Sequence, residues 1–199
     1  MSLITGLIAN DKLTHDSGFT LLELMITIAI AAVLAGIAIP SFKSSISSNR
    51  LTTNANELVT ALNLARSEAV KRGQQVVVRR NGTNWENGWT VFVDIDRSTS
   101  AKENVFNAGA DVELRAYSGL PNSLTLRANA NFADFIRYTP SGQSHAEGSF
   151  AVCDGGAVSG AKLIIVNPVG RVRIASDADH DNIPEKEDTT EISSCTTGF

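Results

Sequence analysis

Two arginines near the C-terminus have a spacing that suits phosphate groups. Arg171 and Arg173 alternate in the string VNPVGRVRIA, residues 166–175. In a β-strand both side chains leave the same face, roughly 7 Å apart. Arginine makes bidentate, charge-assisted bonds to phosphate, and this spacing is close to that of successive phosphates along a nucleic acid. Because paired arginines on a strand are usually a solvated face, the spacing alone predicts only a candidate DNA contact.

The acidic string DADHDNIPEKED follows directly. Positions 1, 3, 5 and 12 of this twelve-residue string are Asp177, Asp179, Asp181 and Asp188. Oxygen ligands at that spacing suit calcium, and the string resembles the D-x-D-x-D-G-x-P loops of calcium-binding repeats. Asn182 stands at position 6, where glycine is usual. The string therefore indicates a calcium site or, as the alternative, a solvated acidic loop, and no other cofactor is expected.

The chain has two cysteines, Cys153 and Cys195, which lie 42 residues apart. Neither belongs to a C-x-x-C pair, so zinc binding and thioredoxin-like chemistry have little support. If the domain lies across a membrane in an oxidising compartment, a disulfide between them is favoured over two buried free thiols.

Catalytic patterns are absent from the sequence. The three histidines are His15, His145 and His180. No Ser-His-Asp order, G-x-S-x-G elbow, P-loop or HExxH helix occurs, so we do not expect an enzyme. The net charge of −4 restricts any affinity for nucleic acid to a local patch.

A long apolar segment near the N-terminus must position the rest of the chain. The 21 residues from Phe19 to Ile39 are almost wholly apolar, which is long enough to cross a bilayer. One charge, Glu23, interrupts them at a cost of roughly 2.5 kcal/mol or more within a membrane. No A-x-A cleavage site follows Ile39, and the small-residue junction Gly18-Phe19 precedes the segment. Composition leaves open an uncleaved anchor or cleavage after Gly18.

The string GFTLLE, residues 18–23, resembles the processing motif of type IV prepilins. The resemblance implies that a prepilin peptidase cleaves after Gly18, which makes residues 1–18 a leader peptide, and methylates the new N-terminus at Phe19. Residues 19–39 would then anchor the chain in the bacterial inner membrane and later enter the filament core with other pilin subunits. Glu23 would meet the α-amino group of a neighbouring subunit, since a buried charge is tolerated when it is paired.

One helix is predicted from about residue 19 to residue 72. Beyond the apolar segment, small and apolar residues recur at spacings of four and three, as on one helical stripe. These residues are Leu51, Ala55, Leu58, Leu62, Ala65 and Ala69. Gly36 and Pro40 predict a kink or loosened segment, and Gly73 predicts the end of the helix.

Short β-rich runs follow, separated by turn residues. The predicted strands are Gln75–Arg80, Trp89–Ile95, Val112–Ser118, Ser123–Arg127, Phe132–Tyr138, Ser149–Cys153, Lys162–Asn167 and Gly170–Ala175. We expect an α+β fold in which the helix stripe packs against antiparallel sheet layers. Residues 40–199 would form the soluble domain, in the periplasm and then on the pilus at the cell surface.

The strings LARSEAVKRGQQVVV and WENGWTVFVDID, residues 64–78 and 85–96, resemble the GspH/FimT group of minor pilins and pseudopilins. Gly-Arg-Val-Arg, residues 170–173, resembles the element by which FimT-type minor pilins bind DNA during natural transformation. The alternative is a structural minor pilin or type II secretion pseudopilin that primes filament assembly without binding DNA. Ion pairs from both arginines to carboxylates such as Asp177 or Glu113 would favour that alternative.

Overall fold

The structure is a computed structural model that describes residues 18–199. The chain separates into two compact units, residues 1–43 and residues 44–199. Helix α1 (Leu21–Arg72) supplies residues to both. It is continuous in secondary structure across Gly36 and Pro40, so the predicted loosening there does not interrupt it.

Both ends of α1 follow from local sequence. The Thr20 hydroxyl accepts a hydrogen bond from the Glu23 N–H (3.1 Å), which satisfies one of the free donors of the first turn. At the other end, Gly73 has a φ of +63°, and the Gln74 N–H donates to the Ala69 carbonyl (3.3 Å). This is the glycine-dependent C-terminal arrangement that the sequence predicts.

Eight strands form two antiparallel four-stranded sheets in the described part of the chain. The first sheet has the order β3-β2-β1-β5 and comprises β1 (Val76–Arg80), β2 (Trp89–Val93), β3 (Val112–Tyr117) and β5 (Phe135–Tyr138). The second sheet has the order β4-β6-β7-β8 and comprises β4 (Leu124–Ala128), β6 (Gly148–Asp154), β7 (Ala157–Val166) and β8 (Val172–Ile174). Short 3₁₀ turns occupy Trp85–Asn87 (η1) and Ala130–Phe132 (η2). The predicted α+β fold and all eight predicted strands are confirmed, with shifted ends.

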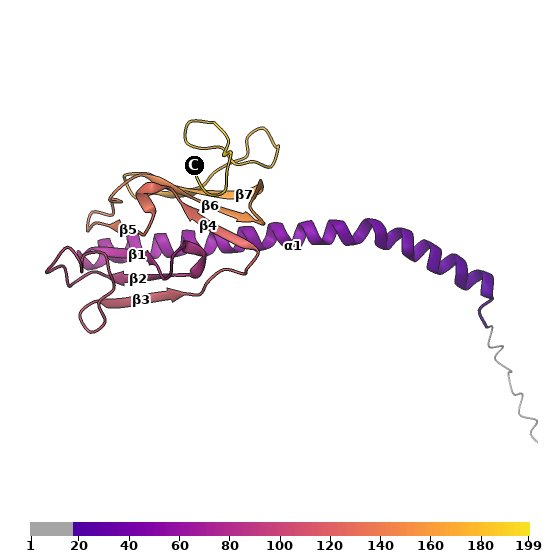
Figure 1. The fold of residues 1–199 in the computed structure, drawn as a ribbon, viewed down its shortest axis with the longest axis horizontal. Helices are drawn as coiled ribbons and strands as arrows, with labels where there is room; N and C mark the ends of the chain where they lie inside the picture. The colour runs from indigo at the N-terminus through magenta and orange to yellow at the C-terminus, as the bar shows by residue number, and fades with distance from the viewer. Residues whose placement is uncertain (1–17) are drawn as a thin grey trace, which may run out of the picture. The chain divides into compact units, whose positions relative to one another are not determined.

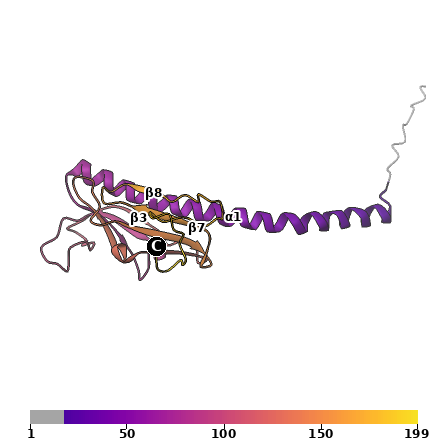
Figure 2. The ribbon, with the colours of Figure 1, turned by 90° about the horizontal axis from the view of Figure 1, so that it is seen from above.

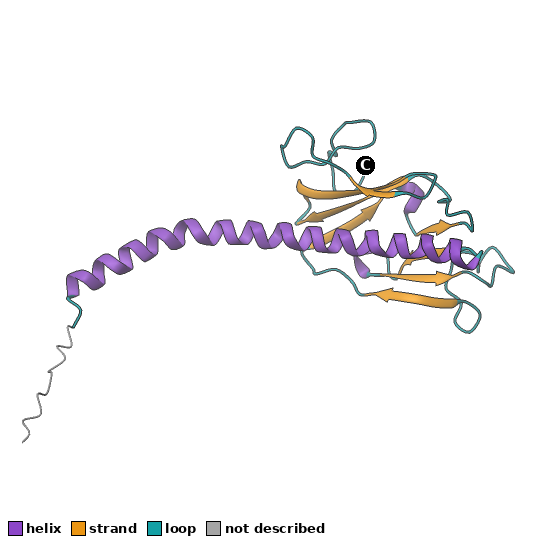
Figure 3. Cartoon of the chain, turned by 180° about the vertical axis from the view of Figure 1, so that it is seen from behind, coloured by secondary structure: helices purple, strands orange, loops and turns teal. Residues whose placement is uncertain are grey.

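The C-terminal half of α1 runs across both sheets (Figures 1 and 3). All six residues of the predicted helical stripe are at most 4% exposed. They share one core with side chains from both sheets, such as Val78 and Ile164. Trp85 and Trp89 lie in this core, and the Trp85 indole donates to the Phe132 carbonyl (2.9 Å).

A second, smaller core lies on the outer face of the second sheet. Cys153, Leu163 and Ile165 belong to it, and Ile192 and Cys195 of the C-terminal segment pack against them. The predicted Cys153–Cys195 disulfide is present, with 6.2 Å between the two Cα atoms. The C-terminal segment thus lies over the outer face of this sheet (Figure 1).

The N-terminal unit contributes the apolar half of α1. By length and composition this helix could cross a membrane. Its large apolar side chains are exposed in the single chain, for example Leu21 at 76% and Ile37 at 71%. Of the predicted leader, residues 1–17 lie outside the described residues.

Candidate functional site

Arg171 lies in the turn that leads from β7 into β8. Strand β8, labelled in Figure 2, is an edge strand of the second sheet. The strand is shorter than the predicted Gly170–Ala175, so Arg171 stands one residue before it. Its N–H donates to Asn167 Oδ1 (2.8 Å), and its carbonyl accepts from the Asn167 N–H (3.1 Å). The Arg171 side chain is exposed and forms no ion pair within residues 18–199.

Arg173 lies within β8, opposite Ile165 of β7. Its guanidinium forms an ion pair with Glu187, and the two side chains are 40% and 72% exposed. Neither Asp177 nor Glu113 is the partner. Exposed pairs of this kind contribute about 0–1 kcal/mol to stability. One arginine of the two is therefore neutralised locally, and the other is not.

Glu187 was not predicted from sequence as a partner of Arg173. The two residues are 14 positions apart, and no short-range pattern links them. The available signal was indirect: a disulfide from Cys195 to the sheet brings the acidic string back over the sheet surface.

Gly170 must be a glycine for a steric reason. Its φ is +78°, in the left-handed region that favours glycine. A Cβ at this position would overlap the carbonyl oxygen of Gly142, in the turn between β5 and β6. The residue before Arg171 is therefore fixed by the close approach of two turns.

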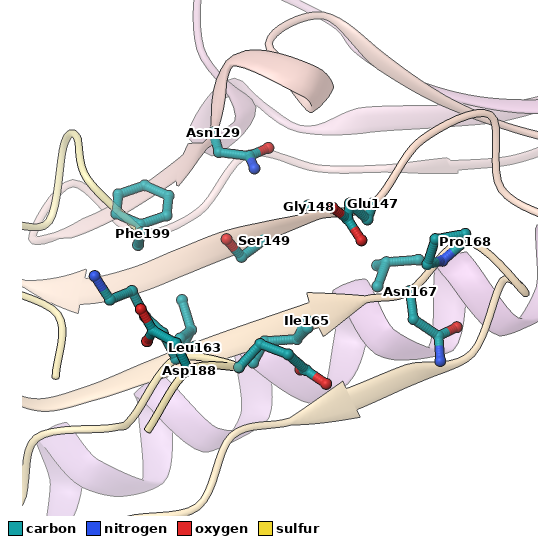
Figure 4. Close-up of a pocket in the computed structure, with 13 residues that line it drawn as sticks. Asn129, Glu147, Gly148, Ser149, Leu163, Ile165, Asn167, Pro168, Asp188 and Phe199 are labelled. Atoms are coloured by element: carbon teal, nitrogen blue, oxygen red, sulfur yellow. The ribbon is translucent and has the colours of Figure 1, made fainter. Parts of the chain in front are cut away.

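A groove of about 440 Å³ lies on the outer face of the second sheet, one strand away from Arg173 (Figure 4). Leu163 and Ile165 lie along it, and Phe199 and residues 186–188 border it. Glu147 and two acidic residues of the border outnumber the one lysine. The residues that line the groove therefore carry a net negative charge.

The acidic string folds into a loop held largely by its own carboxylates. Asp177 accepts from the N–H groups of Asp181 (3.1 Å) and Asn182 (2.9 Å), and Asp181 accepts from the Ile183 N–H (2.7 Å). Asn182 has a φ of +71°, so it adopts the left-handed conformation that a glycine would usually supply.

Two groups of carboxylates in this loop bring one oxygen from each member within 4.8 Å of the others. The groups are Asp177, Asp179 and Glu185, and Asp179, Asp181 and Glu191. The negative charge of Asp181 is the largest cause that raises the pKa of Glu191, as expected when carboxylates crowd together.

Asp188, the fourth predicted calcium ligand, is in neither group. Its carboxylate accepts from the Thr190 hydroxyl (2.6 Å) and N–H (3.1 Å), and the hydroxyl bond is the largest cause that lowers its pKa. The twelve-residue spacing therefore does not bring Asp188 into the carboxylate groups, whereas the β-bridge between Glu185 and Glu191 pairs two residues that contribute to them.

Of the described histidines, His145 has a role in packing. His145 packs against the rings of Phe132 and Phe135, and its Nδ1 accepts from the Arg137 N–H (3.1 Å). Burial lowers its pKa. This places His145 in aromatic packing.

Comparisons with known proteins agree with this architecture. Residues 54–170 match the family of the type II transport protein GspH, and residues 13–39 match the prokaryotic N-terminal methylation motif. A fimbrial protein of Pseudomonas aeruginosa is 35% identical over 107 residues, which cover 52% of this chain and 69% of that protein. The type IV major α-pilin of Moraxella bovis is 31% identical over 103 residues, which cover 52% of this chain and 62% of that protein.

A solved structure shares the fold. The minor pilin FimU of Pseudomonas aeruginosa superposes with a TM-score of 0.55 at 22% identity. The match covers 74% of this chain and 96% of FimU.

Proposed function

The chain belongs to the GspH family and is a minor pilin or pseudopilin, and from this premise we propose that it binds DNA without sequence preference for uptake in natural transformation. The single observation that carries the proposal is the presentation of Arg171. Its side chain is exposed and free of ion pairs within the described chain, and its backbone is held by Asn167 on both sides.

The surrounding charge limits how tightly such a site can bind. Seven of the 21 acidic residues lie in the C-terminal segment: Asp177, Asp179, Asp181, Glu185, Glu187, Asp188 and Glu191. Two arginines neutralise only a few phosphates against this field. We expect a dissociation constant of about 10⁻⁴–10⁻⁶ M, as in non-specific binding, and a steep loss with salt. Within residues 18–199 the α-helix is α1, whose C-terminal half packs into the core of the domain, so sequence preference should be slight.

A DNA titration of the full chain in a neutral detergent tests the proposal. Arg171→Gln with Arg173→Gln should weaken binding and reduce the magnitude of the slope of log K against log salt by about 0.9 for each arginine that contacts a phosphate, up to about 1.8. The matched control is Arg50→Gln with Arg115→Gln, which makes the same charge change at two exposed sites elsewhere. If both double variants bind alike, the proposal is wrong. The alternative then stands, namely a structural subunit that primes filament assembly.

Maturation and assembly are proposed from the N-terminal motif. Cleavage after Gly18 and methylation of Phe19 by a prepilin peptidase would leave α1 anchored in the inner membrane, with the domain in the periplasm. The exposed apolar side chains of α1 support burial in a membrane or among other pilin subunits. The pairing of Glu23 with the amine of a neighbour's Phe19 would set the register. N-terminal sequencing that finds Met1 on the membrane-bound protein would contradict the cleavage.

We also propose that the acidic loop binds calcium, with Glu185 and Glu191 in place of Asp188. Two observations support it besides the clustering: Asn182 adopts the conformation required at position 6, and Glu185 Oε2 is buried without a partner among the described residues. A cation would relieve the repulsion among these carboxylates.

A further inference from the structure

Arg66 of α1 holds together two turns that are far apart in the sequence. Its Nε donates to the Gly142 carbonyl (2.9 Å), and its Nη2 donates to the Val169 carbonyl (3.1 Å). The two acceptors lie 76 and 103 positions further along the chain. No carboxylate forms an ion pair with Arg66 among residues 18–199, so its donors serve backbone oxygens.

The second of these turns is the one that presents Arg171. The Gly170 N–H donates to the Asn167 carbonyl (2.8 Å), and Asn167 Oδ1 holds the Arg171 N–H (2.8 Å). A bond from the Ser144 N–H to the Pro168 carbonyl (3.1 Å) joins the two turns directly. The position of Arg171 thus depends on contacts from outside β8.

Steric fit around the guanidinium supports the same conclusion. A Cβ at Gly170 would lie 3.1 Å from Arg66 Nε, and one at Gly142 would lie 3.5 Å from the same atom. Both glycines have φ of +78°. The two turns therefore approach the Arg66 side chain at residues that lack a side chain of their own.

The chemistry of this contact requires arginine. A guanidinium is planar and offers donors in a fixed fork, so it can reach two carbonyls at once. A lysine ammonium keeps the charge, but it is a compact point charge on a flexible stem and does not reproduce the fork. Hydrogen bonds from a charged donor are also stronger than those between neutral groups.

We propose that Arg66 is a positioning residue for DNA binding, which holds the Gly170–Arg171 turn against α1 so that Arg171 projects at a fixed place. This inference rests on the proposed function. It couples the surface that would contact phosphate to the helix that enters the filament. No local sequence pattern indicates this role for Arg66, because the carbonyls that it meets belong to turns 76 and 103 positions further along the chain.

The test compares Arg66→Lys and Arg66→Gln with the wild type as full chains in detergent, with Arg50→Lys and Arg50→Gln as matched controls on an exposed face of α1. Hydrogen exchange of the Gly170 and Arg171 amides should become about tenfold faster in both Arg66 variants. Exchange of β4 amides should not change, which reports that the fold is intact. The affinity for DNA should fall about threefold to tenfold in both variants.

Two results would overturn the inference. Unchanged exchange at Gly170 and Arg171 would show that Arg66 does not hold the turn. Wild-type affinity in Arg66→Lys with a loss only in Arg66→Gln would show that Arg66 acts through its charge. If the wild-type chain binds no DNA, the proposed function is wrong and the DNA role of Arg66 falls with it, whereas the exchange measurement still decides whether Arg66 holds the turn.

Discussion

The two faces of the second sheet are held by different means. The inner face, with residues such as Val152 and Ile164, is fully buried in the core shared with α1 and the first sheet. Among the described residues, the outer face, with Leu163 and Ile165, is covered by the C-terminal segment through a small apolar cluster and one disulfide. One face of the sheet thus packs into the large shared core. The other face is covered by the small apolar cluster and the disulfide, which together are called the outer cover.

The charged groups of the domain's C-terminal part lie on or beside the outer face of the second sheet. The groove, the Arg173–Glu187 ion pair and the acidic loop all belong to it. Loops over a rigid scaffold can vary in charge without disturbing the core. We therefore expect folding stability to depend mainly on the inner face, and the proposed binding functions to depend on the outer face and its edge strand. The following substitutions test this expectation.

The largest effect is expected from a cavity on the inner side. Leu62 is fully buried, so Leu62→Ala should lower the free energy of unfolding by about 2–5 kcal/mol. Denaturant unfolding measures this loss. Val70→Ala is the control, since Val70 is 55% exposed and should change stability by less than about 0.5 kcal/mol. Similar losses of stability in both variants would contradict the assignment of folding stability to the buried inner face.

Removing the disulfide should be the next largest effect. The bond closes a loop of 42 residues, and its loss should reduce stability by roughly 2–4 kcal/mol. In the variant with Cys153→Ala and Cys195→Ala, protection from hydrogen exchange should fall in the C-terminal segment and persist in β1 and β2. Uniform loss of protection throughout the domain would mean that the outer cover is part of the same cooperative unit as the core.

The helix stripe and the strands were predictable from sequence, and the arrangement of the strands in two sheets was not. The spacing of Leu51, Leu58 and Leu62 reports helix periodicity, and short alternating runs report strands, because both signals are local. The order of strands in two separate sheets depends on pairings over long distances, such as β1 with β5. No local pattern carries that information.

The candidate site was predictable only in part, because local patterns identify its residues and not the distant residues that approach them. Arg171 and Arg173 could be selected by spacing and resemblance. Their different surroundings could not, because Glu187 approaches through a loop closed by a disulfide, and Arg66 approaches from a helix 105 positions before Arg171. Asp188 was wrong as a member of the carboxylate cluster because spacing in sequence does not include the β-bridge within the loop.

Calcium should stabilise the outer cover. If the loop binds calcium, a concentration of 100 times the dissociation constant stabilises the fold by about 2.7 kcal/mol and raises the melting temperature. Asp179→Asn should abolish the shift, because Asp179 belongs to both carboxylate groups. Asp188→Asn should retain it. A melting temperature that responds neither to calcium nor to a chelator would leave only a solvated acidic loop.

The smallest predicted effect concerns the ion pair at the edge of the outer face. Glu187→Gln removes the charge that neutralises Arg173, and since such exposed pairs are weak, stability should change by less than about 1 kcal/mol. If Arg173 contacts phosphate, the affinity for DNA should rise, by about fivefold at most, because Arg173 no longer has to leave a partner.

Glu113→Gln on β3 is the matched control, since it makes the same change in net charge on the other sheet. A titration at two salt concentrations separates the two influences, because general repulsion between exposed charges is screened at high salt, whereas contact with the adjacent Arg173 is screened less. A gain confined to Glu187→Gln places the phosphate contact at β8. Equal gains in affinity in both variants would mean that the effect comes from net charge. Arg173 would then not belong to the proposed site, and Arg171 would be its only arginine.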